Sequence, residues 1–178
     1  MTILDLHLLG SPVLRQESAP VKVVDDETRQ FIADLFATME ASRGVGLAAN
    51  QVGVAKRIAV IDAEGTRLAL VNPRITASSG EETAEEGCLS IPDYFADVTR
   101  PDTVTLEALD EQGRPYAVEL TGLAARAAQH EIDHLDGILF LDHLSPLKRR
   151  RMLSKWKKEH EKDTSYIKPV TPETRESR

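Results

Sequence analysis

The sequence predicts an α+β fold in which antiparallel β-strands pack around one central helix, with an N-terminal helix and a C-terminal basic amphipathic helix. Three patterns support this class: apolar residues at helical spacing after residue 25, short segments rich in Ile, Val and Leu, and an alanine-rich helical segment from about residue 121. The chain has 178 residues, of which 41% are apolar, enough for one compact domain with a real core. We place this single domain at residues 1–162.

The N-terminal helix is predicted to begin at the acidic run Asp25-Asp26-Glu27, because carboxylates stabilise the positive end of a helix. Its apolar residues recur at helical spacing: Phe31, Ile32, Leu35, Phe36 and Met39. We expect the helix to end before Gly44.

The predicted strands are short apolar segments separated by turn residues. Residues 57–62 and 67–72 form a hairpin across the turn at 63–65, and residues 110–113 form a second turn. Later strands are marked by Val98, Val104, Leu106, Val118 and Leu120. The polar, acidic stretch from Ala77 to Glu86 is interpreted as a loop that leads to Cys88.

The central helix carries the sequence Gln-His-Glu-Ile-Asp-His at residues 129–134. Residues four apart share one face of a helix, so His130 and His134 can bind one divalent metal while Glu131 points toward a water on that metal. A metal beside a base indicates hydrolysis. The same pattern standing alone would also fit a charged surface face. We interpret Asp133 and Asp136 as surface or supporting carboxylates.

A third metal ligand is needed, and the sequence offers few choices. Downstream of the motif, His143 lacks the spacing of known histidine ligands, whereas Glu159 and His160 lie in a strongly charged, exposed segment. Upstream is the single cysteine, Cys88. Taken by itself a cysteine is more often a small buried apolar residue than a ligand. With two histidines, however, its thiolate gives three protein ligands and leaves a fourth position open, as in catalytic sites.

The cysteine count and the hydropathy pattern bear on the cellular compartment. A single cysteine cannot form an intramolecular disulfide, which fits a reducing compartment. No segment approaches the roughly 18 apolar residues that span a bilayer, and the first ten residues carry no basic leader. We therefore expect a cytoplasmic protein without a membrane contact.

Three sequence blocks together resemble the signature motifs of peptide deformylases. They are Gly44-Val45-Gly46-Leu47-Ala48-Ala49-Asn50-Gln51, then Glu86-Gly87-Cys88-Leu89-Ser90, then Gln129-His130-Glu131 through His134. Their order across residues 44–137 makes the resemblance specific, and it covers the chain up to about residue 163. It implies a metal-dependent hydrolase that removes the formyl group from the N-terminal formyl-methionine of newly made polypeptides.

The resemblance also implies a role for each site residue. Cys88, His130 and His134 would hold the metal, which in the family is Fe²⁺, with Zn²⁺, Ni²⁺ or Co²⁺ able to occupy the same ligands. Glu131 would act as general base and acid. The Gln51 amide and the backbone N–H of Leu89 would form the oxyanion hole.

The substrate site is predicted from the same motifs. Gly44 and Gly46 would let the backbone approach the peptide because neither has a Cβ, and Val45 would touch the substrate. An apolar slot for the methionine side chain would be lined by Val45, Leu123, Ala127 and the aliphatic part of Arg126. Two positions depart from the family pattern: Arg126, where an apolar residue is more usual, and Asp93, where a glycine commonly follows the second motif.

Two other functions remain open from the residues alone. The motif could belong to an endopeptidase, which would cleave internal bonds of unformylated peptides. The chain could also be a non-catalytic module stabilised by a metal, in which case a fourth protein ligand should close the site. We expect a monomer in each case.

The segment 147–160 is predicted to be a basic amphipathic helix. Eight basic and two acidic residues between Pro146 and Lys162 give this segment a charge of +6, although the whole chain carries −7. Its apolar stripe consists of Met152, Leu153, Trp156 and His160. Two interpretations stay open: the basic face balances an acidic domain, or it contacts ribosomal RNA. Residues 163–178 are expected to be a disordered tail, given their Pro, Thr, Glu, Ser and Arg content.

Overall fold

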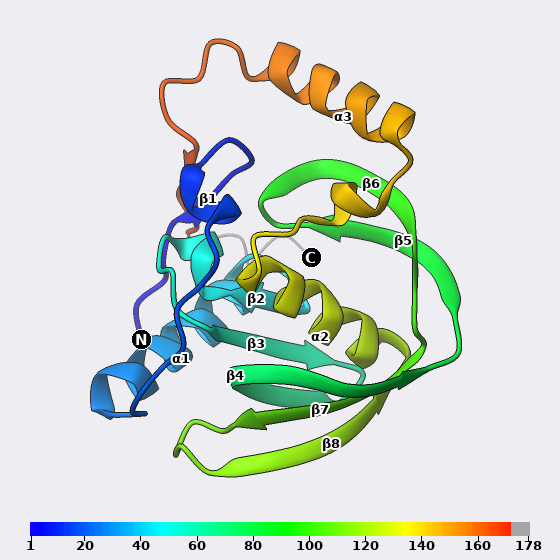
Figure 1. The fold of residues 1–178 in the computed structure, drawn as a ribbon. Helices are drawn as coiled ribbons and strands as arrows, with labels where there is room; N and C mark the ends of the chain where they lie inside the picture. The colour runs from blue at the N-terminus through cyan, green and yellow to red at the C-terminus, as the bar shows by residue number, and fades with distance from the viewer. Residues whose placement is uncertain (172–178) are drawn as a thin grey trace.

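The computed structural model describes residues 1–171 and has the predicted α+β architecture, with a central antiparallel sheet (Figure 1). The five strands of this sheet lie in the order β2-β3-β4-β7-β8. Their bounds are β2 Gly46–Ala48, β3 Ile58–Ala63, β4 Thr66–Ser79, β7 Thr103–Leu109 and β8 Pro115–Thr121. The two turns predicted around residues 64 and 112 join β3 to β4 and β7 to β8, which confirms both hairpins.

Both faces of strand β3 are covered, and this explains its unbroken run of apolar residues. Ala59 and Ile61 face the cluster that contains helix α2 (Gly122–Leu135), whereas Ile58 and Val60 face the cluster that contains helix α1 (Asp26–Ala41). Successive side chains of a strand point to opposite faces, so a strand between two helices needs apolar residues at every position.

Helix α1 forms where the sequence predicts it. The Asp25 carboxylate accepts a hydrogen bond of 2.9 Å from the backbone N–H of Thr28, so Asp25 is the N-cap of the helix. Ile32, Leu35 and Met39 pack against the sheet from this side. The helix ends at Ala41, three residues before the first glycine of the motif block, as expected.

The interpretation of residues 77–86 as a loop is wrong. Strand β4 continues to Ser79 and pairs there with Thr103 of β7, and β5 (Glu82–Cys88) begins after a turn at Gly80. Strand β5 pairs with β6 (Ile91–Arg100) in a separate two-stranded ribbon. Most side chains of this stretch are exposed, so its strands have the polar composition of a loop.

Helix α2 lies across the concave side of the sheet, between the sheet and the β5–β6 ribbon (Figure 1). Its buried alanines, Ala124, Ala125, Ala127 and Ala128, contact apolar residues of β3, β4, β7 and β8. These small side chains allow the helix to lie close to the strands. The ribbon therefore faces the motif side of α2.

The C-terminal part of the chain packs against the ribbon and the N-terminus. A 3-10 turn, η3 (Phe140–His143), leads to helix α3 (Pro146–Glu159), whose Trp156 is buried and donates a 3.0 Å hydrogen bond to the carbonyl of Leu9. The prediction of a basic amphipathic helix is confirmed. Within residues 1–171, no helix is long and apolar enough to cross a membrane.

The expectation of a disordered tail does not hold for the residues that directly follow α3. Strand β9 (Ile167–Lys168) pairs antiparallel with β1 (Leu6–His7), which brings two segments from near the opposite ends of the described chain side by side (Figure 1). A two-residue strand carries no periodic pattern, so composition suggested disorder. The rest of the predicted tail, 172–178, lies outside the described residues.

Candidate active site

Helix α2 presents the two motif histidines on one face. The Nε2 atoms of His130 and His134 lie 3.2 Å apart, as expected for residues one helical turn apart on the same side. The helix is held at its C-terminal end by Asn50 of the first motif block, whose side-chain amide donates to the carbonyl of His134 at 2.5 Å. Asn50 sits in η2 (Ala49–Val52), which directly follows β2.

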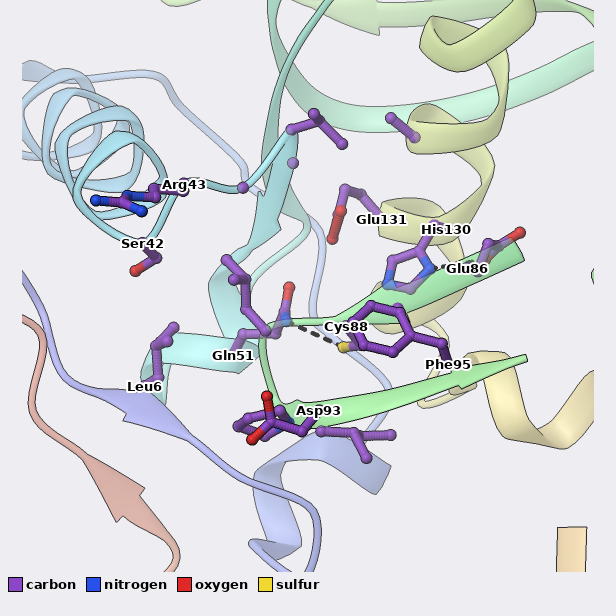
Figure 2. Close-up of a pocket in the computed structure, with 18 of the residues that line it drawn as sticks. Leu6, Ser42, Arg43, Gln51, Glu86, Cys88, Asp93, Phe95, His130 and Glu131 are labelled. Carbon is purple, nitrogen blue, oxygen red and sulfur yellow. Dashed lines mark hydrogen bonds and ion pairs between the residues drawn. The ribbon is translucent and has the colours of Figure 1, made fainter. Parts of the chain in front are cut away.

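Cys88 reaches the same point from the last residue of β5. Its sulfur lies 3.3 Å from Nε2 of His134, and the three ligand atoms of Cys88, His130 and His134 lie within 4.8 Å of one another. Figure 2 shows Cys88 below His130 at the centre of the pocket. The predicted convergence of these three residues is confirmed.

The spacing of these atoms fits one tetrahedral metal ion. Bonds of about 2.3 Å to sulfur and about 2.0–2.1 Å to nitrogen place neighbouring ligand atoms roughly 3.3–3.6 Å apart in a tetrahedron. The observed separations of 3.2 Å and 3.3 Å are close to this range. Within residues 1–171 the group has three ligand residues, which leaves a fourth position for water or substrate.

A buried ion-pair network supports His130 from behind. Nδ1 of His130 lies 3.0 Å from a carboxylate oxygen of Glu86, which fixes the ring so that Nε2 faces the metal position. Arg100 donates to both Glu86 oxygens, at 2.6 Å and 3.0 Å, and Arg126 donates to one at 2.6 Å. Burial raises the pKa of Glu86, but the hydrogen bonds from His130 and Arg100 outweigh it and lower the pKa to about 2.

The sequence analysis missed Arg100, whereas Asp133 is one of the supporting carboxylates that it predicted. Arg100 also donates to Asp133 at 2.9 Å, and Nε2 of His143 lies 2.8 Å from the same carboxylate oxygen. His143 therefore contacts this network through Asp133 and, as the sequence indicated, is not one of the three metal-site residues. The local sequence of β6 gives no sign of this role for Arg100. The arginine is the last residue of the strand, and its burial beside Glu86 is visible only in the folded structure.

Arg126 differs from the simple pocket residue that we expected. Its side chain lines the cavity, but its guanidinium is turned into the network, where it also donates to the carbonyls of Val98 (2.9 Å) and Glu82 (2.8 Å). The charge is therefore paired with Glu86 rather than left at the rim.

Glu131 is the second buried carboxylate of the site. Its side chain is 3% exposed, and among the described residues Oε1 has no hydrogen-bond partner. Burial raises the pKa of Glu131 to about 7. A buried oxygen that no protein group satisfies is available to a water or a substrate in the cavity.

The glycines of the first block make room for neighbouring side chains. A Cβ on Gly46 would lie 2.9 Å from both Cγ and Cδ of Glu131, and a Cβ on Gly44 would lie 2.8 Å from Cδ1 of Leu89. We predicted that these glycines let the backbone approach a substrate. The structure adds a second reason for glycine at these positions: Gly46 leaves space for the side chain of Glu131, and Gly44 leaves space for that of Leu89.

Gln51 is oriented by its own backbone turn. Its Oε1 accepts a 2.9 Å hydrogen bond from the backbone N–H of Ala48, so its Nε2 points to the other side. There Nε2 lies 3.6 Å from the sulfur of Cys88 and 3.1 Å from Oγ of Ser90 (Figure 2). Leu89, in the turn between β5 and β6, lines the same cavity.

Several of these groups line one cavity of about 510 Å³, namely Gln51, Glu86, Cys88, Leu89, Arg126, His130 and Glu131. Each predicted substrate residue lines it: Gly44, Val45, Gly46, Leu123, Arg126 and Ala127. Part of the rim is apolar, since Val45, Leu123 and Phe95 are exposed there by 42%, 39% and 59%, while Glu85 and Lys168 add charged side chains. Sequence reasoning did not assign Phe95 to the rim, nor did it place the C-terminal residues 168–170 in the lining.

A thiolate, two imidazoles and a free carboxylate around an open coordination position define the site of a metal-dependent hydrolase. The comparisons with known proteins specify which one. Residues 3–150 match the model of the polypeptide deformylase family. The chain therefore belongs to the polypeptide deformylase family, and its enzymatic class is peptide deformylase.

Individual relatives agree over most of the chain. A peptide deformylase of Brucella suis is 51% identical over 164 residues, covering 89% of this chain and 94% of the relative. A peptide deformylase of Rhizobium meliloti is 47% identical over 164 residues, with the same coverage. The crystal structure of peptide deformylase from Ehrlichia chaffeensis in complex with actinonin superimposes with a TM-score of 0.86 at 38% identity, covering 89% of this chain and 98% of that one.

Proposed function

We propose that this enzyme removes the formyl group from the N-terminal formyl-methionine of newly made polypeptides, and that it acts as a monomer in the cytoplasm, where such chains emerge. The observation that supports this most directly is the unpartnered, buried Oε1 of Glu131, a residue that lines the same cavity as Cys88 and His130, which form the metal site together with His134. That arrangement provides a base next to an open metal position. The apolar part of the rim, at Val45, Leu123 and Phe95, suits an uncharged peptide end better than a charged amine.

The proton transfers are assigned to Glu131. Cys88, His130 and His134 would hold a divalent cation, which would supply Lewis-acid chemistry and lower the pKa of a water molecule toward about 7. Glu131 accepts a proton from the attacking water and later donates it to the nitrogen of the departing methionine amine, so the C–N bond breaks and formate is released. Burial raises the pKa of Glu131, which favours a carboxylate that can both accept and return a proton.

The negative charge that develops on the formyl oxygen needs donors that already face it. We assign this role to Nε2 of Gln51 and the backbone N–H of Leu89. Support comes from the hydrogen bond between Gln51 and the N–H of Ala48, which holds the amide with its N–H group toward Cys88. Because the amide is fixed before the substrate arrives, little reorganisation is needed during the reaction.

The methionine side chain is assigned to the slot beside the first half of α2. Leu123 and Ala127 lie on this part of the helix and line the cavity, as does Val45 across from them. The stem of Arg126 adds apolar surface, and its guanidinium is held by Glu86. The departure from the family pattern at Arg126 therefore adds no unpaired charge to the slot.

The two alternative functions are separated by their products. A deformylase releases formate from formyl-Met-Ala-Ser and leaves acetyl-Met-Ala-Ser and free Met-Ala-Ser intact, because the formyl carbonyl fits close to the ligands. An endopeptidase cleaves an internal bond of the unformylated peptide, and a metal-stabilised module acts on none of them. Formate detection together with mass spectrometry of the peptides distinguishes the three outcomes, and internal cleavage or inactivity would overturn the proposal.

We propose Fe²⁺ as the working metal, with Zn²⁺, Ni²⁺ and Co²⁺ able to bind the same ligands. A thiolate with two imidazoles suits each of these ions. Protein purified without oxygen should contain about one iron per chain by elemental analysis and should lose turnover on exposure to air. Equal turnover of zinc-loaded and iron-loaded protein would contradict the assignment.

We further propose that the basic face of α3 contacts ribosomal RNA. The buried Trp156 anchors the helix, while Arg150, Arg151 and Lys157 remain exposed. Arg149 is less suitable than the sequence suggested, because its guanidinium lies 3.2 Å from the carboxylate of Asp142. Exposed cations on a fixed helix match a phosphate backbone at little conformational cost.

Charge reversal tests this contact. The variant with Arg150→Glu, Arg151→Glu and Lys157→Glu should lose most of its co-sedimentation with ribosomes at low salt, while formate release from a short peptide stays unchanged. Reversal of Arg74, an exposed residue on β4 of the central sheet, is the control for an exposed arginine outside α3. Equal co-sedimentation of the triple variant and the wild type would overturn the proposal.

A further inference from the structure

The end of the described chain is fixed beside the N-terminus. The carbonyl of Tyr166 accepts a 2.6 Å hydrogen bond from the backbone N–H of Leu8, and β9 continues the pairing with Lys168 opposite Leu6. Figure 1 shows the chain returning from α3 to this position. The segment therefore has a defined place, although it is only a few residues long.

Side chains fix the segment as well. The ring of Tyr166 lies against Gly10, where an added Cβ would come within 2.6–2.8 Å of three ring atoms. Gly10 also has a φ of +111°, which favours glycine, so the position both permits the turn and makes room for the ring. Further along, Val170 is half-buried against the cluster that contains Leu6 and Leu47.

This segment forms part of the active-site cavity. Lys168, Pro169 and Val170 line the cavity together with Leu6. Figure 2 shows Leu6 and the neighbouring strands on the opposite side of Gln51 and Cys88 from helix α2. The cavity thus has one wall made by α2 and another made by the paired ends of the chain.

The peptide substrate has to pass between these walls. With the formyl carbon at the metal centre and the methionine side chain beside α2, the side of the cavity that remains for the following residues is the one bordered by β9. An extended peptide advances about 3.3 Å per residue, so the second and third residues span roughly 7–10 Å. Residues after the methionine therefore meet the C-terminal segment.

Lys168 gives this wall a positive charge. Its side chain is exposed. Among residues 1–171, no carboxylate lies within 4.0 Å of the Lys168 ammonium group, so Lys168 forms no ion pair there. Of the acidic residues that line the cavity, Glu86 is paired with Arg100 and Arg126 and Glu131 lies on α2, whereas Glu85 and Asp93 lie on β5 and β6. An acidic substrate side chain beside Lys168 would gain a favourable interaction, and a basic one would not.

We propose that β9 with Pro169 and Val170 forms the subsite for the second and third residues after the formyl-methionine, and that Lys168 selects for an acidic side chain there. This inference rests on the proposed deformylation. It assigns a specificity role to a part of the chain that lies beyond the family match at residues 3–150.

The test compares two amidated substrates, formyl-Met-Ala-Asp and formyl-Met-Ala-Lys. The ratio of their kcat/KM values should exceed one in the wild-type full chain and should fall about fivefold in Lys168→Glu, mainly through KM. Tyr166→Ala, which removes the ring from Gly10, should bring the ratio toward one because β9 is then less firmly held. Lys162→Glu, also exposed but outside the cavity lining, should keep the wild-type ratio.

The possible outcomes distinguish failure of the subsite from failure of the fold and from failure of the proposed function. An unchanged ratio in Lys168→Glu, or the same change in Lys162→Glu, overturns the subsite. Thermal unfolding of the variants separates loss of selection from loss of fold, since an exposed Lys168→Glu should keep the wild-type unfolding temperature. If the wild type releases formate from neither peptide, the proposed function fails instead of the subsite.

Discussion

Two buried carboxylates lie on either side of His130, and their surroundings give them opposite properties. Glu86 is 5% exposed and accepts hydrogen bonds from Arg100, Arg126 and His130, so its pKa falls to about 2. Glu131 is 3% exposed and keeps one oxygen without a partner among the described residues, so burial raises its pKa to about 7. The same side chain is a fixed anion in one place and an available base in the other.

This difference teaches that the protein environment, more than residue type, separates supporting groups from reactive ones. A carboxylate surrounded by donors holds its neighbours in place and has no capacity left for chemistry. A carboxylate that is buried without donors is costly to ionise and is kept where a proton must be moved. Variants that alter either environment should therefore have distinct effects on stability and on turnover.

The largest effect on stability is expected for Arg100→Ala. This change removes both Arg100 hydrogen bonds to Glu86 and the one to Asp133, and it leaves buried carboxylates underpaired. Breaking a buried ion pair in this way should lower the free energy of unfolding by about 3–5 kcal/mol. Urea denaturation measures the loss. Arg74→Ala, which removes an exposed pair with Glu107, is the control and should stay within about 1 kcal/mol of wild type.

Gly46→Ala should act on the other carboxylate. The new methyl group would overlap the Glu131 side chain and displace its carboxylate, which should reduce kcat about 100-fold, since small misplacements of a catalytic group have effects of this size. Metal content should remain at the wild-type level. Gly65→Ala is the control: its φ of +81° strains the hairpin tip, but no atom lies near the new methyl group and the site is unaffected, so kcat should be preserved. Comparable kcat values for Gly46→Ala and wild type would contradict the spatial argument.

A smaller effect is expected for Arg126→Met, which keeps the apolar stem and removes the guanidinium. Glu86 keeps its two hydrogen bonds from Arg100, so the loss should be about 1–2 kcal/mol of unfolding free energy, less than for Arg100→Ala. Because the guanidinium points into the network and away from the methionine slot, KM for formyl-Met peptides should change less than threefold, roughly 0.6 kcal/mol. A larger change in KM than in stability would place the charge in the slot instead.

Much of the fold could be predicted from the sequence, because its elements have strong local patterns. Helix α1 has its capping aspartate and apolar spacing, and strands β3 and β4 have apolar runs around a glycine turn. The polar ends of β4 and β5 could not be predicted, since strands that are solvent-exposed need no apolar face. Strand β9 is too short for any periodicity, and its pairing with β1 depends on a contact between opposite ends of the chain.

The three residues of the metal site were also predictable. His130 and His134 are four residues apart, which places them on one face of a helix, and Cys88 is the single cysteine of the chain. The network behind them was not predictable. Arg100 and Glu86 are 14 residues apart on paired strands, and their contact with His130 exists only once the β5–β6 ribbon packs against α2. Such contacts depend on tertiary packing, which no local motif records.

The central claim is that Glu131 moves the proton while the metal is held by other residues, and Glu131→Gln tests it most directly. Formate release from a formyl-Met peptide and metal content per chain should be measured on the same preparation. We expect kcat to fall by about 10²–10⁴, with metal content and unfolding free energy at or above the wild-type values. Turnover near the wild-type level in a metal-loaded Glu131→Gln protein would contradict the account.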